Sequence, residues 1–478
     1  MQPPEPPTMV SEIDLSASKR PLVLVGASVR AAAQSANRAG FDVLGIDCFG
    51  DIDTRQACRW FATFDQVDAL DLEEFARVFA RRSSGASMMA APLMVVGGSQ
   101  NTAIHDPAIN PETNDPAVRE PSFGAGGFGE SGKVSGLSVL ERVLRRLAGH
   151  TRRVGVDAAE ERQLQDPAVL SRIAIRSRTT FPAFRDAKAV STSADLPGRW
   201  LNKSNISSGG LGICWSDDAK QHGDNAIATP GSCPELQKPE LQKSEQQIRQ
   251  LWRPGRSYGA SFLSDGDEIM LLGVCRSMFT AKGQQRFVYA GSLGPVRLPE
   301  VVQKQLYAVG QQVVNQVGAE GLFNADVLID DDQKVCLLEV NGRWSASMEC
   351  LERSLVDATK MQSENLSLIG LAMTSAEGKP LRVNQRRINS MQSDAPRYLK
   401  RIIYARRSGK IDESVFEEIE LRKAIGFSQV EICDRPHHGQ SVVAGEPLCS
   451  VICCLNARES LGWRKTKRLF ASLQKAVV

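Results

Sequence analysis

The sequence predicts an α/β protein of roughly three domains: an open parallel α/β domain first, a larger α+β part in the middle and a small β-rich domain last. Three observations support this prediction. From residue 21 to 150, apolar strand-like runs alternate with helical segments. From 151 to 370, long strand-like runs are joined by turns that contain Asp. From 371 to 478, short apolar runs precede a closing helical segment at 459–476.

The composition is that of an ordinary globular protein, 42% hydrophobic and 24% charged. With 58 basic and 55 acidic residues, the net charge of +3 gives no reason to expect a nucleic-acid partner. We see no signal peptide and no long apolar run, so we expect no membrane partner, a cytoplasmic location and a disordered tail at 1–20. Eleven Cys without a CxxC pair indicate reduced thiols, and Cys449, Cys453 and Cys454 lie in an apolar run that predicts a buried strand.

The N-terminal domain, at 21–150, begins with two apolar runs, PLVLVG and FDVLGID, on either side of a helix-forming segment at 27–39. Ser28 and Arg30 follow the first run at a strand-to-helix turn, where free N–H groups and the helix dipole favour an anion. A second turn, Gly97–Asn101, follows a later strand. Pro, Asn, Ser and Gly dominate 102–136, which predicts an exposed insertion. Within it, Gly127–Lys133 has Walker A spacing but no preceding strand, so we do not expect a phosphate loop.

A candidate phosphate site follows a predicted pair of helices at 157–174. Lys203 ends a short strand, and a Ser/Gly-rich loop comes next. The lysine supplies a point charge, and the loop lets the backbone N–H groups of Ser208, Gly209 and Gly210 approach phosphate oxygens. Polar residues at 216–247 predict a second exposed insertion, which precedes strands at 257–265 and 268–279.

The chemistry centres on a predicted β-hairpin at 321–341. If its turn closes on residues 332 and 333, Asp326 lies opposite Glu339, and Asn341 shares their face by the two-residue period of a strand. Two facing carboxylates in apolar strands repel, and a hard cation with oxygen ligands removes that cost. The set therefore predicts a Mg²⁺ or Mn²⁺ site. Arg343 and Ser345 follow on the same side of the turn.

These motifs, in this order, resemble the ATP-grasp superfamily, in which a glycine-rich lid covers the ATP phosphates and an acid plus an E-x-N motif holds two Mg²⁺ ions. Ser204 and Gly342 stand where the common patterns have proline. The resemblance implies an ATP-grasp domain at 151–370, with a lid at about 180–255 and a metal-binding core at about 256–350. It also implies ATP and two Mg²⁺ or Mn²⁺ ions as cofactors. The residues that it assigns to these cofactors are Lys203, Ser208, Gly209 and Gly210 at the phosphates, Leu251 and Trp252 at adenine through their backbone, and Asp326, Glu339 and Asn341 at the metals.

The chain also looks like the predicted ATP-dependent carboligase-like proteins related to biotin carboxylase, some of which are associated with tetrahydromethanopterin and methanofuran C1 pathways. The Phe287–Pro295 stretch resembles a loop of that subgroup. This resemblance implies an ADP-forming ligase that joins a small-molecule carboxylate to an amine, with Arg343 and Lys203 in catalysis and with Ser28, Arg30 and Ser345 touching substrate. Two alternatives stay open: carboxylation through carboxyphosphate, as in biotin carboxylase, and a nucleotide-binding regulatory protein without catalysis.

Overall fold

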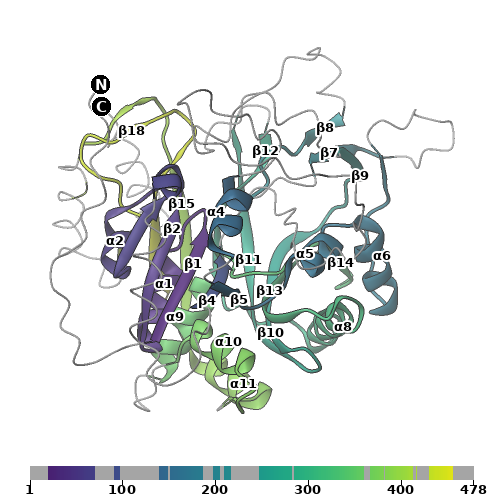
Figure 1. Ribbon diagram of the computed structural model, residues 1–478. Coiled ribbons are helices and arrows are strands. Elements are labelled where there is room, and N and C mark those ends of the chain that lie inside the picture. Colours follow the sequence, from purple (N-terminus) through teal and green to yellow (C-terminus); the bar gives the residue numbers. More distant parts are fainter. Residues whose placement is uncertain are drawn as a thin grey trace, which may run out of the picture.

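The computed structural model describes most of the folded parts of the chain (Figure 1). The described residues are 20–69, 91–96, 139–148, 151–186, 198–204, 209–216, 247–282, 285–359, 366–381, 383–412, 416 and 430–455. Several expectations lie outside these ranges: the tail at 1–19, the Gly97–Asn101 turn, the insertion at 102–136, Ser208, almost all of the insertion at 216–247 and the helix at 459–476. No helix within the described ranges has the length and apolar character needed to cross a membrane.

The first sheet is parallel, with strand order β3-β2-β1-β4-β5, and confirms the predicted open α/β domain. Its strands are β1 (Arg20–Gly26), β2 (Phe41–Asp47), β3 (Trp60–Thr63), β4 (Ala91–Val96) and β5 (Thr151–Arg153). The helices of this part are α1 (Arg30–Arg38), α2 (Ile52–Ala57), η1 (Phe64–Ala69) and α4 (Val139–Leu147). β1 and β2 read as unbroken apolar runs because helices cover both faces of a parallel sheet. The loops after β1 and β2 therefore open at one edge.

The second sheet is antiparallel and has eight strands in the order β14-β13-β10-β11-β12-β15-β19-β17. Its strands are β10 (Arg256–Asp265), β11 (Ile269–Lys282), β12 (Gln285–Gly294), β13 (Glu320–Ile329), β14 (Val335–Asn341), β15 (Arg397–Tyr404), β17 (Val430–Cys433) and β19 (Pro447–Leu455). The expected loop at Phe287–Pro295 is wrong, because that stretch is almost entirely β12, paired with β11 and β15. Through β15, the C-terminal strands extend the central sheet.

Two smaller sheets complete the β-structure. One has the order β6-β9-β7-β8 and lies at the upper right of Figure 1. Its strands are β6 (Phe184–Asp186), β7 (Trp200–Ser204), β8 (Cys214–Trp215) and β9 (Gln247–Leu251). The other pairs β16 (Gly409–Lys410) with β18 (Ser441–Val442). β7 carries Lys203, so this small sheet sets the position of the candidate phosphate site relative to the central sheet.

Helices cover both faces of the central sheet. They are α5 (Ala158–Leu164), α6 (Pro167–Arg176), α8 (Glu300–Val317), α9 (Met348–Thr359), α10 (Leu368–Ala376) and α11 (Gln385–Asp394). The predicted break between α5 and α6 is confirmed: Asp157 and Glu160 form a capping box on α5, and Asp166 caps α6 just before Pro167. One apolar core joins α5, α6 and α8 to the central sheet. Another joins α9 and α10 to α1 and β1, and so fixes the parallel sheet against the central one.

The predicted burial of the C-terminal cysteines in a strand is confirmed. Cys449, Cys453 and Cys454 are buried in β19. His437 lies in a turn after β17, where its Nε2 is 2.8 Å from the carbonyl oxygen of Gly50. That contact ties the C-terminal strands to the loop that follows β2.

Candidate active site

The hairpin of β13 and β14 brings the predicted metal ligands together. Asp326 pairs with Glu339, and Asn324 pairs with Asn341. The two-residue period then places all four side chains on one face. Asn341 Nδ2 donates to Asp326 Oδ2 at 3.1 Å and to Glu339 Oε1 at 3.5 Å. The sequence analysis missed Asn324, although its position two residues before Asp326 in the same strand was a usable signal.

The predicted pairing is present, but the turn that produces it differs from the expected one. Next to the turn, Ile329 pairs with Val335, one residue out of the register predicted from a turn at 332–333. Gln333 has a φ of 62°, which makes the loop one residue longer. The register shifts again beyond Val327, and Leu338 is left without a partner in the ladder. This bulge restores the pairing of the two acids.

The acids lie directly opposite each other at the cavity, where the Glu339 side chain is 47% exposed. Burial, followed by the charge of Glu339, raises the pKa of Asp326 well above its usual range, while Asn324 and Arg343 act in the opposite direction. Asn324 Nδ2 donates to Asp326 Oδ1 at 2.9 Å. On the neighbouring strand, a Cβ at Gly259 would stand 3.1–3.3 Å from these side-chain atoms, so glycine leaves room for them. Crowded carboxylates with amide neighbours form a donor set that suits a hard divalent cation.

The metal site would depend on amide ligands as well as carboxylates. Among the described residues, no group of three or more His, Cys, Asp or Glu side chains could hold a metal ion. Two carboxylates and the side-chain oxygens of Asn324 and Asn341 leave several positions for water or phosphate, which is the usual arrangement for Mg²⁺ in nucleotide sites. The residues present therefore fit the metal that the sequence analysis expected.

Lys203 and the glycine-rich loop face this hairpin. Lys203 Nζ lies 3.8 Å from Glu339 Oε2. The carbonyl of Gly209 accepts a hydrogen bond from the Tyr289 N–H at 2.8 Å, which fixes the loop to β12. Gly210 has a φ of 76°, and a Cβ there would stand 1.8 Å from the carbonyl oxygen of Phe287. Only glycine fits this close approach of two backbones.

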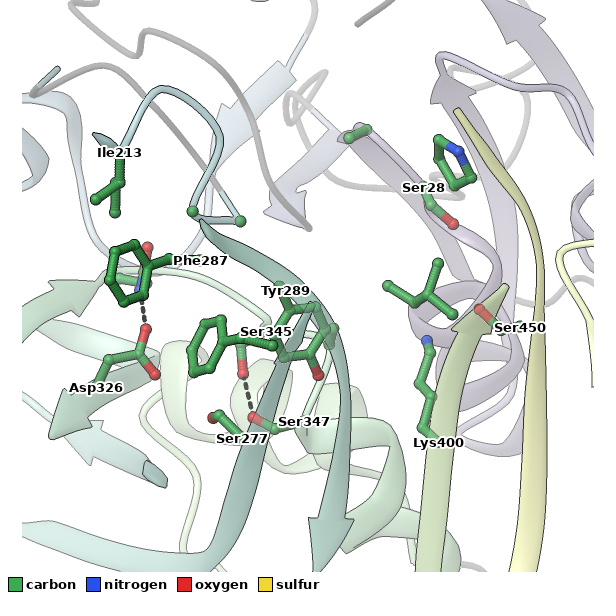
Figure 2. A pocket seen from close by; sticks show the side chains of 18 of the residues that line it. Ser28, Ile213, Ser277, Phe287, Tyr289, Asp326, Ser345, Ser347, Lys400 and Ser450 are labelled. Atoms are coloured by element: carbon green, nitrogen blue, oxygen red, sulfur yellow. Dashed lines mark hydrogen bonds between the residues drawn. The ribbon is translucent and has the colours of Figure 1, made fainter. Parts of the chain in front are cut away.

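A cavity of about 960 Å³ lies between these elements. Figure 2 shows Asp326, Ile213 and Phe287 at one end of it and Ser28, Lys400 and Ser450 at the other. The volume is at the upper end of the range for small-molecule sites, enough for a nucleotide and a second ligand. Lys203, the two loop glycines, the hairpin acids and the expected substrate contacts all line this one cavity.

Leu251 and Trp252 also line the cavity, but their N–H groups are already bonded. Leu251 donates to the carbonyl of Ala183 at 2.8 Å, and Trp252 donates to that of Arg199 at 2.9 Å. The predicted backbone contacts to adenine around Leu251 and Trp252 stay a prediction, and these two N–H groups could serve only if adenine replaced an existing hydrogen bond. The other backbone groups around Leu251 and Trp252, such as the carbonyl oxygens, could still contact adenine. The rings of Trp252 and Trp215 lie 6.2 Å apart beside the cavity and form an aromatic wall.

Arg343 and Ser345 lie where the hairpin leads into α9. Both line the cavity. Arg343 Nε is buried and has no hydrogen-bond partner among the described residues. Ser345 Oγ is 2.9 Å from Ser347 Oγ. An unpaired guanidinium N–H at a cavity wall is costly unless an anion binds there, so the geometry supports an anionic ligand beside Arg343.

Arg30 does not offer its charge to a ligand, and its expected role as a substrate contact is corrected. Its side chain is fully buried. Its guanidinium donates to Glu349 at 2.8 and 2.9 Å and to Asp434 at 2.7 Å. Lys400 Nζ donates to the same Glu349 carboxylate at 2.7 Å. Ser28 Oγ stays at the cavity wall, 3.5 Å from Asp434 Oδ1.

Sequence reasoning could not have found this ion cluster, because Arg30 is more than 300 residues away from Glu349, Lys400 and Asp434. It also missed three cations that line the cavity, Arg253, Arg256 and Arg276. Their signal was weak, because single arginines in or beside strands are ordinary surface residues. Only the sheet order brings β10 and β11 beside the hairpin acids.

Comparisons with known proteins agree with this geometry. A family model described as an ATP-grasp domain matches residues 182–347. A search of curated proteins finds no match.

Several solved structures share the fold. Carboxyaminoimidazole ribonucleotide synthase from Aspergillus clavatus, complexed with ATP, matches 96% of this chain and 99% of its own, with 12% identity and a TM-score of 0.57. An L-amino acid ligase from Bacillus licheniformis matches 96% and 98%, with 13% identity and a TM-score of 0.55. Biotin carboxylase from Campylobacter jejuni matches 92% and 88%, with 11% identity and a TM-score of 0.55. Residues 182–347 therefore match an ATP-grasp domain, and the chain as a whole shares the fold of these solved structures.

Proposed function

We propose that the protein is an ADP-forming ligase that activates a small-molecule carboxylate as an acyl phosphate and transfers the acyl group to an amine. The observation that carries the proposal is the facing pair of Asp326 and Glu339, with Lys203 Nζ 3.8 Å from Glu339, at the wall of a cavity large enough for ATP and a second substrate. A protein without catalytic activity would have no reason to keep two carboxylates that repel each other at this position.

In the proposed reaction, a carboxylate oxygen of the substrate attacks the γ-phosphorus of ATP, and the bond to ADP breaks. The amine nitrogen then attacks the acyl carbon, the carbon–oxygen bond to phosphate breaks, and phosphate and a proton leave. Bound Mg²⁺ would neutralise phosphate charge during the first transfer. Lys203 and the loop N–H groups hold phosphate oxygens, and Asp326, Glu339 and Asn341 are the residues that would hold the metal.

Arg343 acts on the acyl side. Its unpaired Nε and its place at the cavity wall support a role in holding the substrate carboxylate. A guanidinium can hold a carboxylate by two parallel hydrogen bonds and then stabilise negative charge that develops on the acyl oxygen. The structural similarity to the L-amino acid ligase is compatible with this reaction class.

The test is ADP release by the purified protein with ATP, Mg²⁺ and pooled carboxylates and amines in bicarbonate-free buffer. We expect release that requires both pools, and Glu339→Gln should reduce it at least tenfold while the thermal midpoint stays near that of the wild type. Glu300→Gln, a change at an exposed helix position, is the matched control and should have no effect. Release that requires only bicarbonate would favour carboxylation instead, and no release under any condition would refute catalysis.

A further inference from the structure

The end of the cavity opposite the hairpin acids contains one acid without a partner. Asp51 follows β2 and is only 5% exposed, yet it lines the cavity. It stands at the N-cap position of α2, but its side chain accepts no hydrogen bond from that helix. Among the described residues, no donor or cation forms a hydrogen bond or ion pair with its carboxylate. An Asp at an N-cap normally caps, so this carboxylate is free for another use.

The neighbouring carboxylates are already satisfied. Asp47 accepts from three backbone N–H groups, and Asp53 accepts from two. Asp434 accepts from the guanidinium of Arg30 at 2.7 Å. These contacts hold the loop after β2 against the segment that follows β17. They also place Asp51 among three other acids, Asp47, Asp53 and Asp434, whose charges Arg30 offsets in part.

The cations near this end form ion pairs with carboxylates other than that of Asp51. Arg30 is fully buried between Glu349, Asp434 and Asp53. Lys400 donates to Glu349. Burial, followed by the charges of nearby acids, raises the pKa of Asp51 well above its usual range. A cation bound in the cavity would reverse that effect, because it stabilises the ionised carboxylate.

A metal ion is not supported at this end, because no group of three His, Cys, Asp or Glu side chains in the described ranges has the geometry of a metal site, although several acids lie close together here. The C-terminal segments contribute apolar side chains to the cavity lining beside polar ones such as Ser441 and Ser450. The apolar ones are Ile402, Ile411, Val442 and Leu448. The loop of Asp51 contacts these strands directly, since the N–H of Ile52 donates to the carbonyl of Arg435 at 2.8 Å.

From this juxtaposition we infer that the Asp51 end of the cavity is an amine-binding subsite, in which the Asp51 carboxylate receives the ammonium group of a substrate whose apolar body lies against β15, β18 and β19. This inference rests on the proposed function and names the substrate class: a primary amine with an apolar body. Asp51 is the position at which the ammonium group first binds; for the attack, the nitrogen loses a proton and leaves Asp51 for the acyl carbon. The carboxylate lies beside Arg343, and the amine enters from the side of the parallel sheet, where ligands of open α/β sheets bind.

The experiment is calorimetric titration of the full-length protein, saturated with ADP and Mg²⁺, with 2-phenylethylamine, hexylamine and ethanolamine. Each amine is compared with its neutral isostere, in which a hydroxyl replaces the amino group. We expect the two apolar amines to bind at least tenfold more tightly than their alcohols and more tightly than ethanolamine. Asp51→Asn should remove that difference without changing ADP affinity. Asp42→Asn, an acid of the same domain that pairs with Arg59 outside the cavity, is the control and should keep it.

Equal binding of every amine and its alcohol to the wild-type protein would overturn the inference, and so would undiminished amine preference in Asp51→Asn. The thermal midpoint of Asp51→Asn should equal or exceed that of the wild type, because the change replaces a buried carboxyl group that has no partner by a neutral amide of similar shape. Failure of the amine subsite can be distinguished experimentally from failure of the proposed ligase activity. ADP release that depends on Glu339 but not on Asp51 would overturn only the subsite, whereas Asp51-dependent amine binding without any ADP release would overturn only the ligase.

Discussion

Replacing Glu349 by Gln should destabilise the protein strongly, because this one carboxylate neutralises three cations. It accepts from Arg30 at 2.8 and 2.9 Å, from Lys400 at 2.7 Å and from Arg353 at 3.1 Å, and its side chain is 4% exposed. Gln keeps the shape but carries no charge, and its amide nitrogen would face the donors that now bind an oxygen. Arg30 and Lys400 would remain buried with reduced compensation.

The magnitude follows from the burial of the cluster. Breaking a buried ion pair from one side costs about 3–5 kcal/mol. With a shift of about 2–4 °C per kcal/mol for domains of this size, the thermal midpoint should fall by on the order of 10 °C. The matched control is Glu377→Gln, which breaks pairs with two cations on the surface, Arg20 and Lys379. Exposed pairs contribute at most about 1 kcal/mol, so the control should move by no more than a few degrees.

The assay is the thermal midpoint measured by circular dichroism between pH 3 and 8. Burial alone would raise the pKa of Glu349, but Arg30, Lys400 and Arg353 outweigh it and hold the pKa well below the usual 4.5. An acid with a lowered folded-state pKa stabilises the fold above its ordinary pKa and loses that contribution as the pH falls through the folded-state value. The difference between wild type and Glu349→Gln should therefore be constant near neutrality and shrink in acid below about 4.5. A midpoint as close to the wild type as that of Glu377→Gln would refute the reasoning.

Three further predictions concern the cavity. Lys203→Ala should raise the KM for ATP and lower kcat, and unchanged ATP kinetics would remove Lys203 from the site. Arg343→Lys should leave ATP affinity near that of the wild type but reduce turnover by about 10²-fold, because it loses a bidentate carboxylate contact; small parallel losses in both would contradict the assignment. Gly210→Ala should impair ATP turnover more than Gly209→Ala, since both have positive φ but only at Gly210 would a Cβ collide with backbone, 1.8 Å from Phe287 O; equal effects would show that backbone conformation alone matters.

The sequence by itself determined the local elements and the chemistry of the hairpin. Alternation of apolar runs with helical segments predicted the parallel sheet, and the Asp166–Pro167 break predicted where α6 begins, because these signals depend on neighbours in the chain. The pairing of Asp326 with Glu339 was also predicted, although a longer turn and a bulge, two offsetting departures, produce it.

Only the tertiary structure decided which side chains line the same cavity and which charged side chains already form ion pairs within the protein. Arg30 looks available in the sequence, but Glu349 and Asp434 occupy its guanidinium from more than 300 residues away. Asp51 shows the reverse: nothing in the sequence singled it out, but in the structure its carboxylate leaves α2 uncapped and lines the cavity. The physical reason is the same for both residues. Electrostatic partners are chosen by proximity in space, and that proximity is set by the packing of α1 and α9 between two sheets, which no local pattern encodes.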